Sequence, residues 1–527
     1  MNTQELTSER SDQNAVKMRT VEPAAVVPSW HSWCWLAAAV FSLLFADGRN
    51  TIALAAWVAP ACLLRVARTQ PLWRGASLVY VAFVVMRAIT YRGMIPIPGI
   101  FYYLFLAVAA LFATTPYLVD RVLSRKLGSG LGTLVFPSTL VVVQFASSYG
   151  AHGSWGSVAY TQAGNLPLLQ SLSVFGLWGI AFLIGWFASA VNQLLEQGLR
   201  SRIALKTAVL FAGIYGVIIL AGGARLTLFP PDSEVVRTAS LSPLKNDLSI
   251  PQSLLDGVLQ GSASEAQVRQ FNSLAAAGQQ ELLLRTDREA RAGAKIVFWS
   301  EGAATVLKQS EAALLAKAQT MARNDQIYLG LSMAVWTAQQ QHPLENKMTL
   351  IDPSGKTAFE FLKARPTPGP EMAAAQASDG LLPLTITSFG RMSAAICYDM
   401  DFPRLIAQAG RQRVDILLSP ASDWAGIDPR HTQMAQFRAI EQGFNLLRQA
   451  NLGLSAAYDY EGRALATMDD RHSEDLTLVA EIPTRGVQTV YARFGDWFAW
   501  TCVLAVVVLA LSALRRANGA AAGAANK

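Results

Sequence analysis

The stretch Met392-Ser-Ala-Ala-Ile-Cys397-Tyr398-Asp399 decides how the soluble part of this chain is interpreted. Its run of small and β-branched apolar residues predicts a buried strand that ends at a cysteine, directly before a polar turn. A thiol at such a strand end can serve as a nucleophile, but a free cysteine is equally often a small buried apolar side chain. The sequence on either side has to decide between the two interpretations.

The composition indicates that part of the chain lies in a membrane. Of its 527 residues, 52% are hydrophobic and only 15% are charged, which is too apolar for an ordinary soluble protein of this size. Apolar runs fill residues 34–222 and 496–514, whereas residues 223–494 have the composition of a soluble domain. We therefore predict a cytoplasmic tail, a transmembrane domain of about seven helices, an extracytoplasmic domain, a last transmembrane helix and a second tail, at 1–32, 33–223, 224–494, 495–514 and 515–527.

Eight apolar runs are candidate membrane spans, at 33–48, 51–68, 76–93, 97–119, 131–149, 170–194, 204–223 and 496–514. Several are shorter than the roughly 20 residues that a span usually needs, and the first two could form a re-entrant hairpin. Arg and Lys cluster in alternate loops, so the positive-inside rule places the N-terminus in the cytoplasm and the large domain outside it. Arg87, at the end of the third run, either snorkels to the interface or contacts a lipid phosphate.

The net charge and the cysteines exclude some classes of function. The net charge of +7 reflects the loops between spans, and no basic patch with interleaved aromatic residues predicts nucleic-acid binding. Cys397 is the one cysteine of the large domain, because the others, Cys34, Cys62 and Cys502, lie in apolar runs. An unpaired thiol in an oxidising compartment suggests that it has a use. None of the five histidines has a metal-ligand spacing, so no metal or other cofactor is expected.

Strands and helices alternate in the large domain. Lys295 to Glu301 predicts a buried strand that ends in a carboxylate, and a hairpin from Met348 to Leu362 precedes Lys363. Later segments predict the strand Val414 to Pro420 and the helix Thr432 to Gly443, with His431 near the start of that helix and without a catalytic role. Several strands end in polar residues, so a layered α/β domain with a site at its strand ends is expected.

The order Glu301, Lys363, Cys397 resembles the catalytic triad of the carbon-nitrogen hydrolase, or nitrilase, superfamily. A nitrilase-like domain placed before the last of about eight spans is similar to the bacterial apolipoprotein N-acyltransferases, a membrane branch of that superfamily. The segments that carry this resemblance are 296–301, 361–371, 395–399, 173–183 and 489–497. The fold that it implies is a multi-pass α-helical membrane domain plus an α/β nitrilase-like α-β-β-α sandwich.

The resemblance implies a role for each residue of the triad. Glu301 would take the proton of the Cys397 thiol, although alone it could equally cap a helix. Lys363 would lower the thiol pKa and stabilise an oxyanion together with the backbone N–H of Tyr398, although alone it could be a solvated loop cation. Glu371 would orient Lys363 and keep it charged.

Three loops depart from the family pattern. Asp399 stands where the family has Glu, and this is where a changed substrate would first show. Pro370 stiffens the loop before Glu371. Asp423 and Trp424 lie in a loop one residue shorter than usual, at the expected substrate mouth. Trp155, in a Gly- and Ser-rich outer loop, is a further candidate there, as a membrane-interface anchor or a guide for a lipid.

The resemblance implies a phospholipid:apolipoprotein N-acyltransferase. An acyl chain would pass from a phospholipid, through a thioester on Cys397, to the α-amine of the N-terminal diacylglyceryl-cysteine of a lipoprotein. The alternative is a membrane-tethered, amidase-like carbon-nitrogen hydrolase that acts on an extracytoplasmic small amide. A monomer in the bacterial inner membrane is expected, with its catalytic domain on the periplasmic side and with no nucleic-acid partner.

Overall fold

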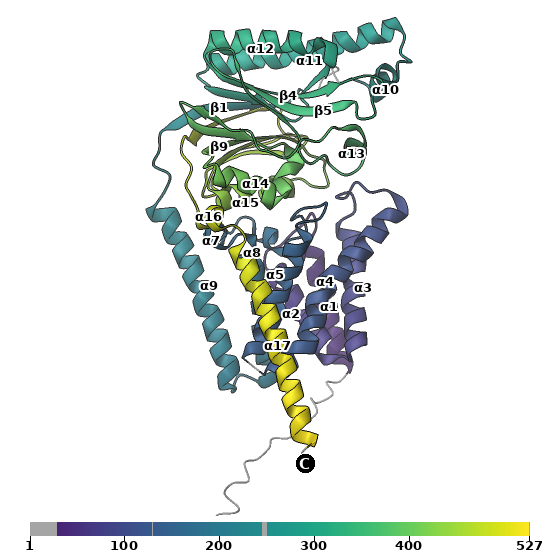
Figure 1. The fold of residues 1–527 in the computed structure, drawn as a ribbon, viewed down its shortest axis with the longest axis vertical. Helices are drawn as coiled ribbons and strands as arrows, with labels where there is room; N and C mark the ends of the chain where they lie inside the picture. The colour runs from purple at the N-terminus through teal and green to yellow at the C-terminus, as the bar shows by residue number, and fades with distance from the viewer. Residues whose placement is uncertain (1–28, 129, 245–249, 526–527) are drawn as a thin grey trace, which may run out of the picture.

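The computed structural model of the chain describes residues 29–128, 130–244 and 250–525. Most of the first predicted tail, at 1–28, and the last two residues lie outside the described residues. Figure 1 shows a bundle of helices on one side and a layered α/β domain on the other. The chain enters the α/β domain from helix α9 and leaves it into helix α17, so this domain is an insertion between two helices of the bundle.

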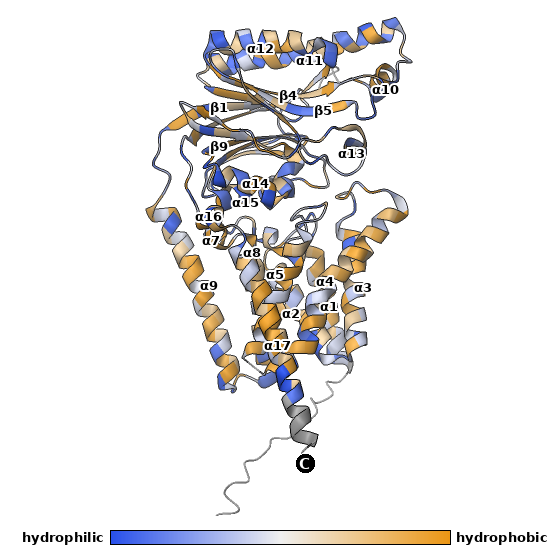
Figure 2. Cartoon of the chain, viewed as in Figure 1, coloured by the Kyte–Doolittle hydropathy of each residue, from blue (hydrophilic) through white to orange (hydrophobic). Residues whose placement is uncertain are grey.

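Helices occupy each of the eight apolar ranges: α1 Ser29–Ala46, α2 Ala55–Thr69, α3 Leu72–Thr90, α4 Gly99–Leu127, α5 Val135–Ser147, α8 Leu177–Gln197, α9 Arg202–Leu228 and α17 Trp497–Ala525. Among the described residues, five of them (α3, α4, α8, α9 and α17) are long and apolar enough to cross a membrane. Figure 2 shows apolar residues along α9, α17, α3 and α4. Because almost none of α9 is buried in the protein, its apolar surface needs a lipid environment.

The sixth apolar run is divided, although it was predicted as one span at 170–194. Two short helices, α6 Leu166–Leu169 and α7 Leu172–Phe175, precede α8, and the chain turns at Gly176 with a φ of +61°. A Cβ at Gly176 would lie 2.4 Å from the ring of Tyr491. The turn therefore needs glycine both for its backbone conformation and for the close approach of Tyr491.

Two sheets pack face to face in the α/β domain. One has the order β13-β1-β2-β4-β5-β6, with β3 paired to β4, and the other has the order β12-β11-β10-β9-β8-β7. The first is built from β1 Val235–Leu241, β2 Ile296–Trp299, β3 Ala304–Leu307, β4 Tyr328–Trp336, β5 Leu344–Ile351, β6 Thr357–Leu362 and β13 Thr477–Pro483. The second is built from β7 Thr385–Thr387, β8 Gly390–Ala394, β9 Ile416–Ser422, β10 Asn445–Asn451, β11 Leu454–Tyr458 and β12 Ala464–Asp469.

Helices cover the outer face of each sheet, which gives the predicted α-β-β-α sandwich. The helices α11 Glu265–Arg291 and α12 Glu311–Asp325 lie over the first sheet, and α14 Pro403–Arg411 and α15 Arg430–Gln442 lie under the second (Figure 1). No element was predicted for residues 252–291, where the structure has α10 Gln252–Gln260 and α11. A capping box begins α11, because Ser264 and Gln267 satisfy each other's backbone N–H groups.

The inner faces of the two sheets form one apolar core. Phe298 and Met348 from the first sheet and Leu418 and Leu446 from the second are fully buried in the same cluster. Each such side chain contributes about 2 kcal/mol to folding through the apolar surface that it removes from water. The core holds the ends of β2, β6 and β8 in fixed positions, and those ends carry the predicted catalytic residues.

Helix α15 joins the α/β domain to the membrane domain. Arg438 and Glu441, both fully buried, form an ion pair of 2.7 Å on this helix. The guanidinium of Arg438 also donates to the Tyr160 hydroxyl at 3.0 Å, and the Glu441 carboxylate accepts the backbone N–H of Leu177 at 2.9 Å. The two domains are therefore connected by buried charged groups that leave little freedom for one to slide over the other.

Candidate active site

Cys397 lies at a sharp turn between a strand and a short helix. Strand β8 ends at Ala394, and Cys397 begins the 3-10 helix Cys397–Asp401, so the strand ends three residues before the predicted position. The backbone of Cys397 has a φ of +50°, which is strained for a residue with a side chain. The residue is 3% exposed, and its thiol donates to the carbonyl of Ser422 at 3.8 Å. A strained turn of this kind projects a nucleophile away from its sheet.

Asp399 holds this turn in place. Its carboxylate accepts the backbone N–H groups of Ile396 at 3.0 Å and of Arg365 at 2.7 Å, which joins the Cys397 turn to the loop after Lys363. Burial raises the pKa of Asp399 to about 7, although Lys363 and the backbone donors oppose the shift. Asp399 is not one of the described residues that line the cavity at Cys397. Asp399 therefore supports the backbone of the Cys397 turn, and the expectation that a changed substrate would first show there stays a prediction.

The ammonium of Lys363 lies between two carboxylates. It donates to Glu301 at 2.7 Å and to the two oxygens of Glu371 at 2.7 and 2.9 Å, and it is 1% exposed. Asn346 donates to the same two carboxylates, at 2.8 Å to Glu301 and 2.7 Å to Glu371. Sequence reasoning missed Asn346. Its sequence neighbours Glu345 and Lys347 are charged, so no local signal set this amide apart.

The charges around the thiol determine how it can react. Burial raises the pKa of Cys397, the Glu301 carboxylate raises it further, and Lys363 opposes them, so the net shift is well above the ordinary value. The predicted lowering of the thiol pKa by Lys363 is therefore only one part of the balance. Burial alone would lower the pKa of Lys363, but Glu301, Cys397 and Glu371 outweigh it and raise it. A protonated thiol beside a permanent ammonium needs a base at the moment of attack, and Glu301 is the carboxylate that acts on the thiol most strongly.

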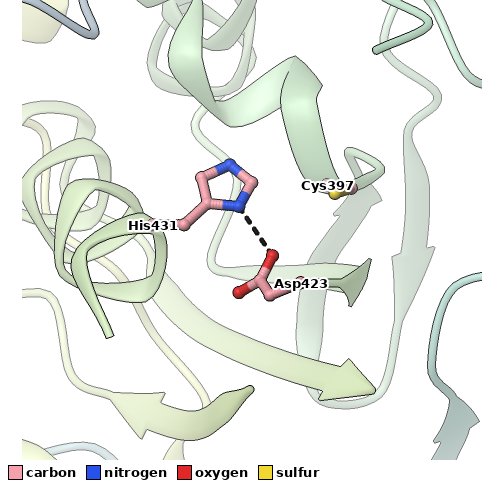
Figure 3. A group of neighbouring side chains, drawn as sticks. All are labelled: Cys397, Asp423 and His431. Carbon is pink, nitrogen blue, oxygen red and sulfur yellow. Dashed lines mark hydrogen bonds and ion pairs between the residues drawn. The ribbon is translucent and has the colours of Figure 1, made fainter. Parts of the chain in front are cut away.

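A second buried group of charges lies behind the cysteine. Figure 3 shows Asp423 bonded to His431 beside Cys397. The distance from Asp423 to His431 Nδ1 is 2.7 Å, and Arg448 donates to the same carboxylate at 3.1 and 3.2 Å. His431 Nε2 lies 3.2 Å from an oxygen of Asp401, without the alignment of a hydrogen bond. Asp423 is 2% exposed, so its predicted place at the substrate mouth is wrong: it is the anion of a buried network.

Cys397, Asp423 and His431 each offer one ligand atom within 4.8 Å of the others, a grouping that their spacing in the chain did not reveal. The guanidinium of Arg448 donates to Asp423 and lies 2.8 Å from His431 Nδ1. A cation placed among these three groups would be repelled by Arg448 at close range. The residues therefore fit a network of ion pairs better than a metal site.

The pKa of His431 makes the stability of this network depend on pH. Burial would lower it, but Asp401 and Asp423 raise it to about 9, from 6.5 in the unfolded chain. Burial would raise the pKa of Asp423, but Arg448 and His431 lower it to about 2. Asp423 therefore stays ionised between pH 6.5 and 9, where His431 titrates. The stabilisation from charged His431 is then complete below pH 6.5 and is lost as the pH rises through 9.

We expect the wild-type protein to lose stability relative to His431→Gln between pH 6.5 and 9, by up to about 3 kcal/mol. Unfolding of both proteins in detergent at several pH values in this range measures the difference. Curves for the two proteins that run parallel across the range would show that His431 is not charged in the folded state.

A cavity of about 130 Å³ opens at Cys397, and both domains form its walls. The α/β domain contributes Tyr398 and Trp424, and the loop between α5 and α8 contributes Trp155. The indole N–H of Trp424 donates to the carbonyl of Gly93 at 2.9 Å, and the ring of Trp155 lies 5.9 Å from that of His431. The structure thus places Trp155 at the cavity and against the α/β domain.

Comparisons with known proteins were made for both parts of the chain. Residues 31–190 match the family model of the apolipoprotein N-acyltransferase N-terminal domain, and residues 263–492 match the model of carbon-nitrogen hydrolase. The chain is 25% identical to the apolipoprotein N-acyltransferase of Bradyrhizobium diazoefficiens over 434 residues, which are 77% of each chain. It is 27% identical to that of Rhodopseudomonas palustris, with the same coverage. A solved amidase from Nesterenkonia sp. is 17% identical and covers 50% of this chain and 94% of its own, with a TM-score of 0.38.

Proposed function

The chain belongs to the apolipoprotein N-acyltransferase family, and from this premise we propose that it moves an acyl chain from a phospholipid to the α-amine of the diacylglyceryl-cysteine of a lipoprotein. The observation that carries the proposal is the position of Cys397. Its thiol lies in a cavity whose walls come from both the membrane domain and the α/β domain. A substrate that lies in lipid can reach such a site without leaving the membrane for water.

Glu301, Lys363 and Cys397 would carry out the first half of the reaction. Glu301 takes the thiol proton as sulfur attacks the ester carbonyl of the phospholipid. The Lys363 ammonium and the backbone N–H of Tyr398 stabilise the negative oxygen of the tetrahedral intermediate. The carbon–oxygen bond then breaks, the leaving alkoxide takes the proton from Glu301, and a lysophospholipid departs. The acyl chain remains on Cys397 as a thioester.

The second half uses the same groups in the same positions. The α-amine of the lipoprotein attacks the thioester, and Glu301 takes a proton from the attacking nitrogen. The carbon–sulfur bond breaks, the Cys397 sulfur recovers the proton, and an amide is formed. Glu371 and Asn346 act on the reaction only by holding Lys363 and Glu301 in position.

We place the protein in the bacterial inner membrane, with the catalytic domain 224–494 on the periplasmic side and helices from 33–223 and 495–514 in the lipid. Arg and Lys residues in alternate loops support this orientation.

One chain supplies every residue proposed for the site, which supports a monomer. The amidase alternative is not favoured, because the family of the membrane domain is that of lipoprotein acylation.

The acceptor decides the function, and a synthetic lipopeptide tests it. Purified protein in detergent is incubated with phospholipid and a diacylglyceryl-cysteinyl peptide that has a free α-amine. We expect the peptide to gain the mass of one acyl chain, whereas a matched peptide with an acetylated amine gains none. Release of free fatty acid with both peptides unmodified would contradict transfer and support water as the acceptor.

A further inference from the structure

Arg87 is a charged residue near the outer end of helix α3, in the wall of an apolar cavity. Its side chain is 13% exposed and lies over the rings of Phe83 and Tyr91, with its guanidinium carbon 5.2 and 5.8 Å from the ring centroids. An arginine in a membrane-spanning helix is costly, so its presence calls for a partner.

Among the described residues, the guanidinium of Arg87 finds too few acceptors for its hydrogen-bond donors. Its Nη1 donates to the carbonyl of Ala109 at 3.1 Å, and its buried Nε has no hydrogen-bond partner. The nearest carboxylate, Asp47, lies 3.6 Å from Nε. That carboxylate already accepts the Tyr91 hydroxyl at 2.6 Å and pairs with Arg430 at 3.4 Å. Most of the donor capacity of Arg87 is therefore unused in a place where unmade hydrogen bonds are expensive.

Arg87 lies where two cavities meet. The cavity of about 130 Å³ contains Cys397, and a larger one of about 420 Å³ runs among the membrane helices. Arg87, Phe105, Ala109, His152 and Gly156 line both of them, and Arg87 is the one arginine or lysine among the described residues that line either. A ligand that fills both cavities must therefore pass the guanidinium of Arg87.

The local charge balance favours an anion at this junction. Two guanidinium groups, those of Arg87 and Arg430, face one carboxylate, that of Asp47, which leaves one positive charge. Burial lowers the pKa of His152, although Asp401 opposes the shift, so this ring adds no charge at neutral pH. In apolar surroundings an uncompensated positive charge binds a single negative charge strongly.

We propose that Arg87 binds the phosphodiester of the acyl-donor lipid. A phosphodiester carries one negative charge and presents two oxygens that match the fork of a guanidinium. With the phosphate at Arg87, one cavity holds the ester at Cys397 and the other is free for an acyl chain. The inference rests on the proposed function, because it takes the donor to be a glycerolipid, and it adds the residue that would distinguish phospholipids from uncharged lipids.

The test measures acyl-thioester formation on Cys397 by intact mass, with two donors that differ only in phosphate. These are phosphatidylglycerol and the diacylglycerol with the same acyl chains. Wild-type protein is expected to prefer phosphatidylglycerol by at least about tenfold. Arg87→Gln should slow the reaction with phosphatidylglycerol by at least about tenfold and change the rate with diacylglycerol by less than about twofold. Arg87→Lys should recover part of the preference, because it keeps the charge without the fork.

Arg74→Gln is the matched control, because Arg74 is an exposed arginine at the opposite end of the same helix. It should leave both rates unchanged. Equal use of the two donors by the wild type, or equal slowing of both by Arg87→Gln, would overturn the proposal and leave the transferase function standing. No thioester from either donor would contradict the proposed function itself. Slowing by added glycerol 3-phosphate that Arg87→Gln removes would reassign the site to free phosphate esters.

Discussion

The Cys397→Ser variant is expected to form no acyl adduct with phospholipid and to transfer acyl chains at least about 10³-fold more slowly than the wild type. Serine keeps the shape of the strained turn but replaces the sulfur with an oxygen that Glu301 cannot deprotonate as readily. Intact mass after incubation with phospholipid measures the adduct, and transfer to the free-amine lipopeptide measures the rate.

Cys34→Ser is the matched control for this loss. Cys34 is the exposed cysteine among the four and lies in helix α1, away from the cavity at Cys397. The variant should retain the full adduct and the full rate. An adduct that persists in Cys397→Ser, or disappears in Cys34→Ser, would show that the acyl chain is carried by a different residue.

The Lys363→Met variant is expected to lose about 10²- to 10³-fold in transfer rate, because it removes the ammonium that faces the oxyanion. It also leaves the carboxylates of Glu301 and Glu371 together without their shared cation. One of them must then take up a proton, and Glu301 is weakened as a base. Removing one member of a buried ion pair of this kind costs about 3–5 kcal/mol of folding free energy. Transfer rate and thermal unfolding are therefore measured on the same preparation.

Lys347→Met separates the two effects. Lys347 is also a buried lysine held by carboxylates, at 2.6 Å from Glu311 and 3.0 Å from Glu345. Within the described part of the chain, it forms no ion pair with Glu301 or Glu371. This variant should lose stability comparably and keep its transfer rate per folded molecule. If Lys347→Met slows transfer as much as Lys363→Met does, the effect of Lys363 is structural and its role at the oxyanion is excluded.

The family, the fold class and the three candidate catalytic residues could be predicted from the sequence because each depends on local pattern or on order along the chain. Long apolar runs separate lipid-facing helices from a soluble domain whatever their packing. Glu301, Lys363 and Cys397 each follow a strand, and strand periodicity is visible within a few residues. Their roles remain proposals, whereas their meeting at one site is a feature of the structure.

Contacts between distant segments were decided by the tertiary structure. Asn346 meets Glu301 across 45 residues, and the ring of Tyr491 packs on Gly176 to divide a run that reads as one span. Asp423 lies in the loop after β9, where the sequence predicts a substrate-mouth residue, yet Arg448 and His431 enclose it.

The Cys397 strand separates what the sequence alone determined from what depended on the tertiary structure. Its run of small and β-branched apolar residues predicted a buried strand just before the thiol, since strand propensity is a local property. Whether that thiol was inert packing or faced a base, an ammonium and a cavity depended on side chains that arrive from other strands and from the membrane helices. Electrostatic and hydrogen-bond contacts depend on distances of a few ångströms in space and not on separation along the chain. Only folding could therefore bring these partner groups to Cys397.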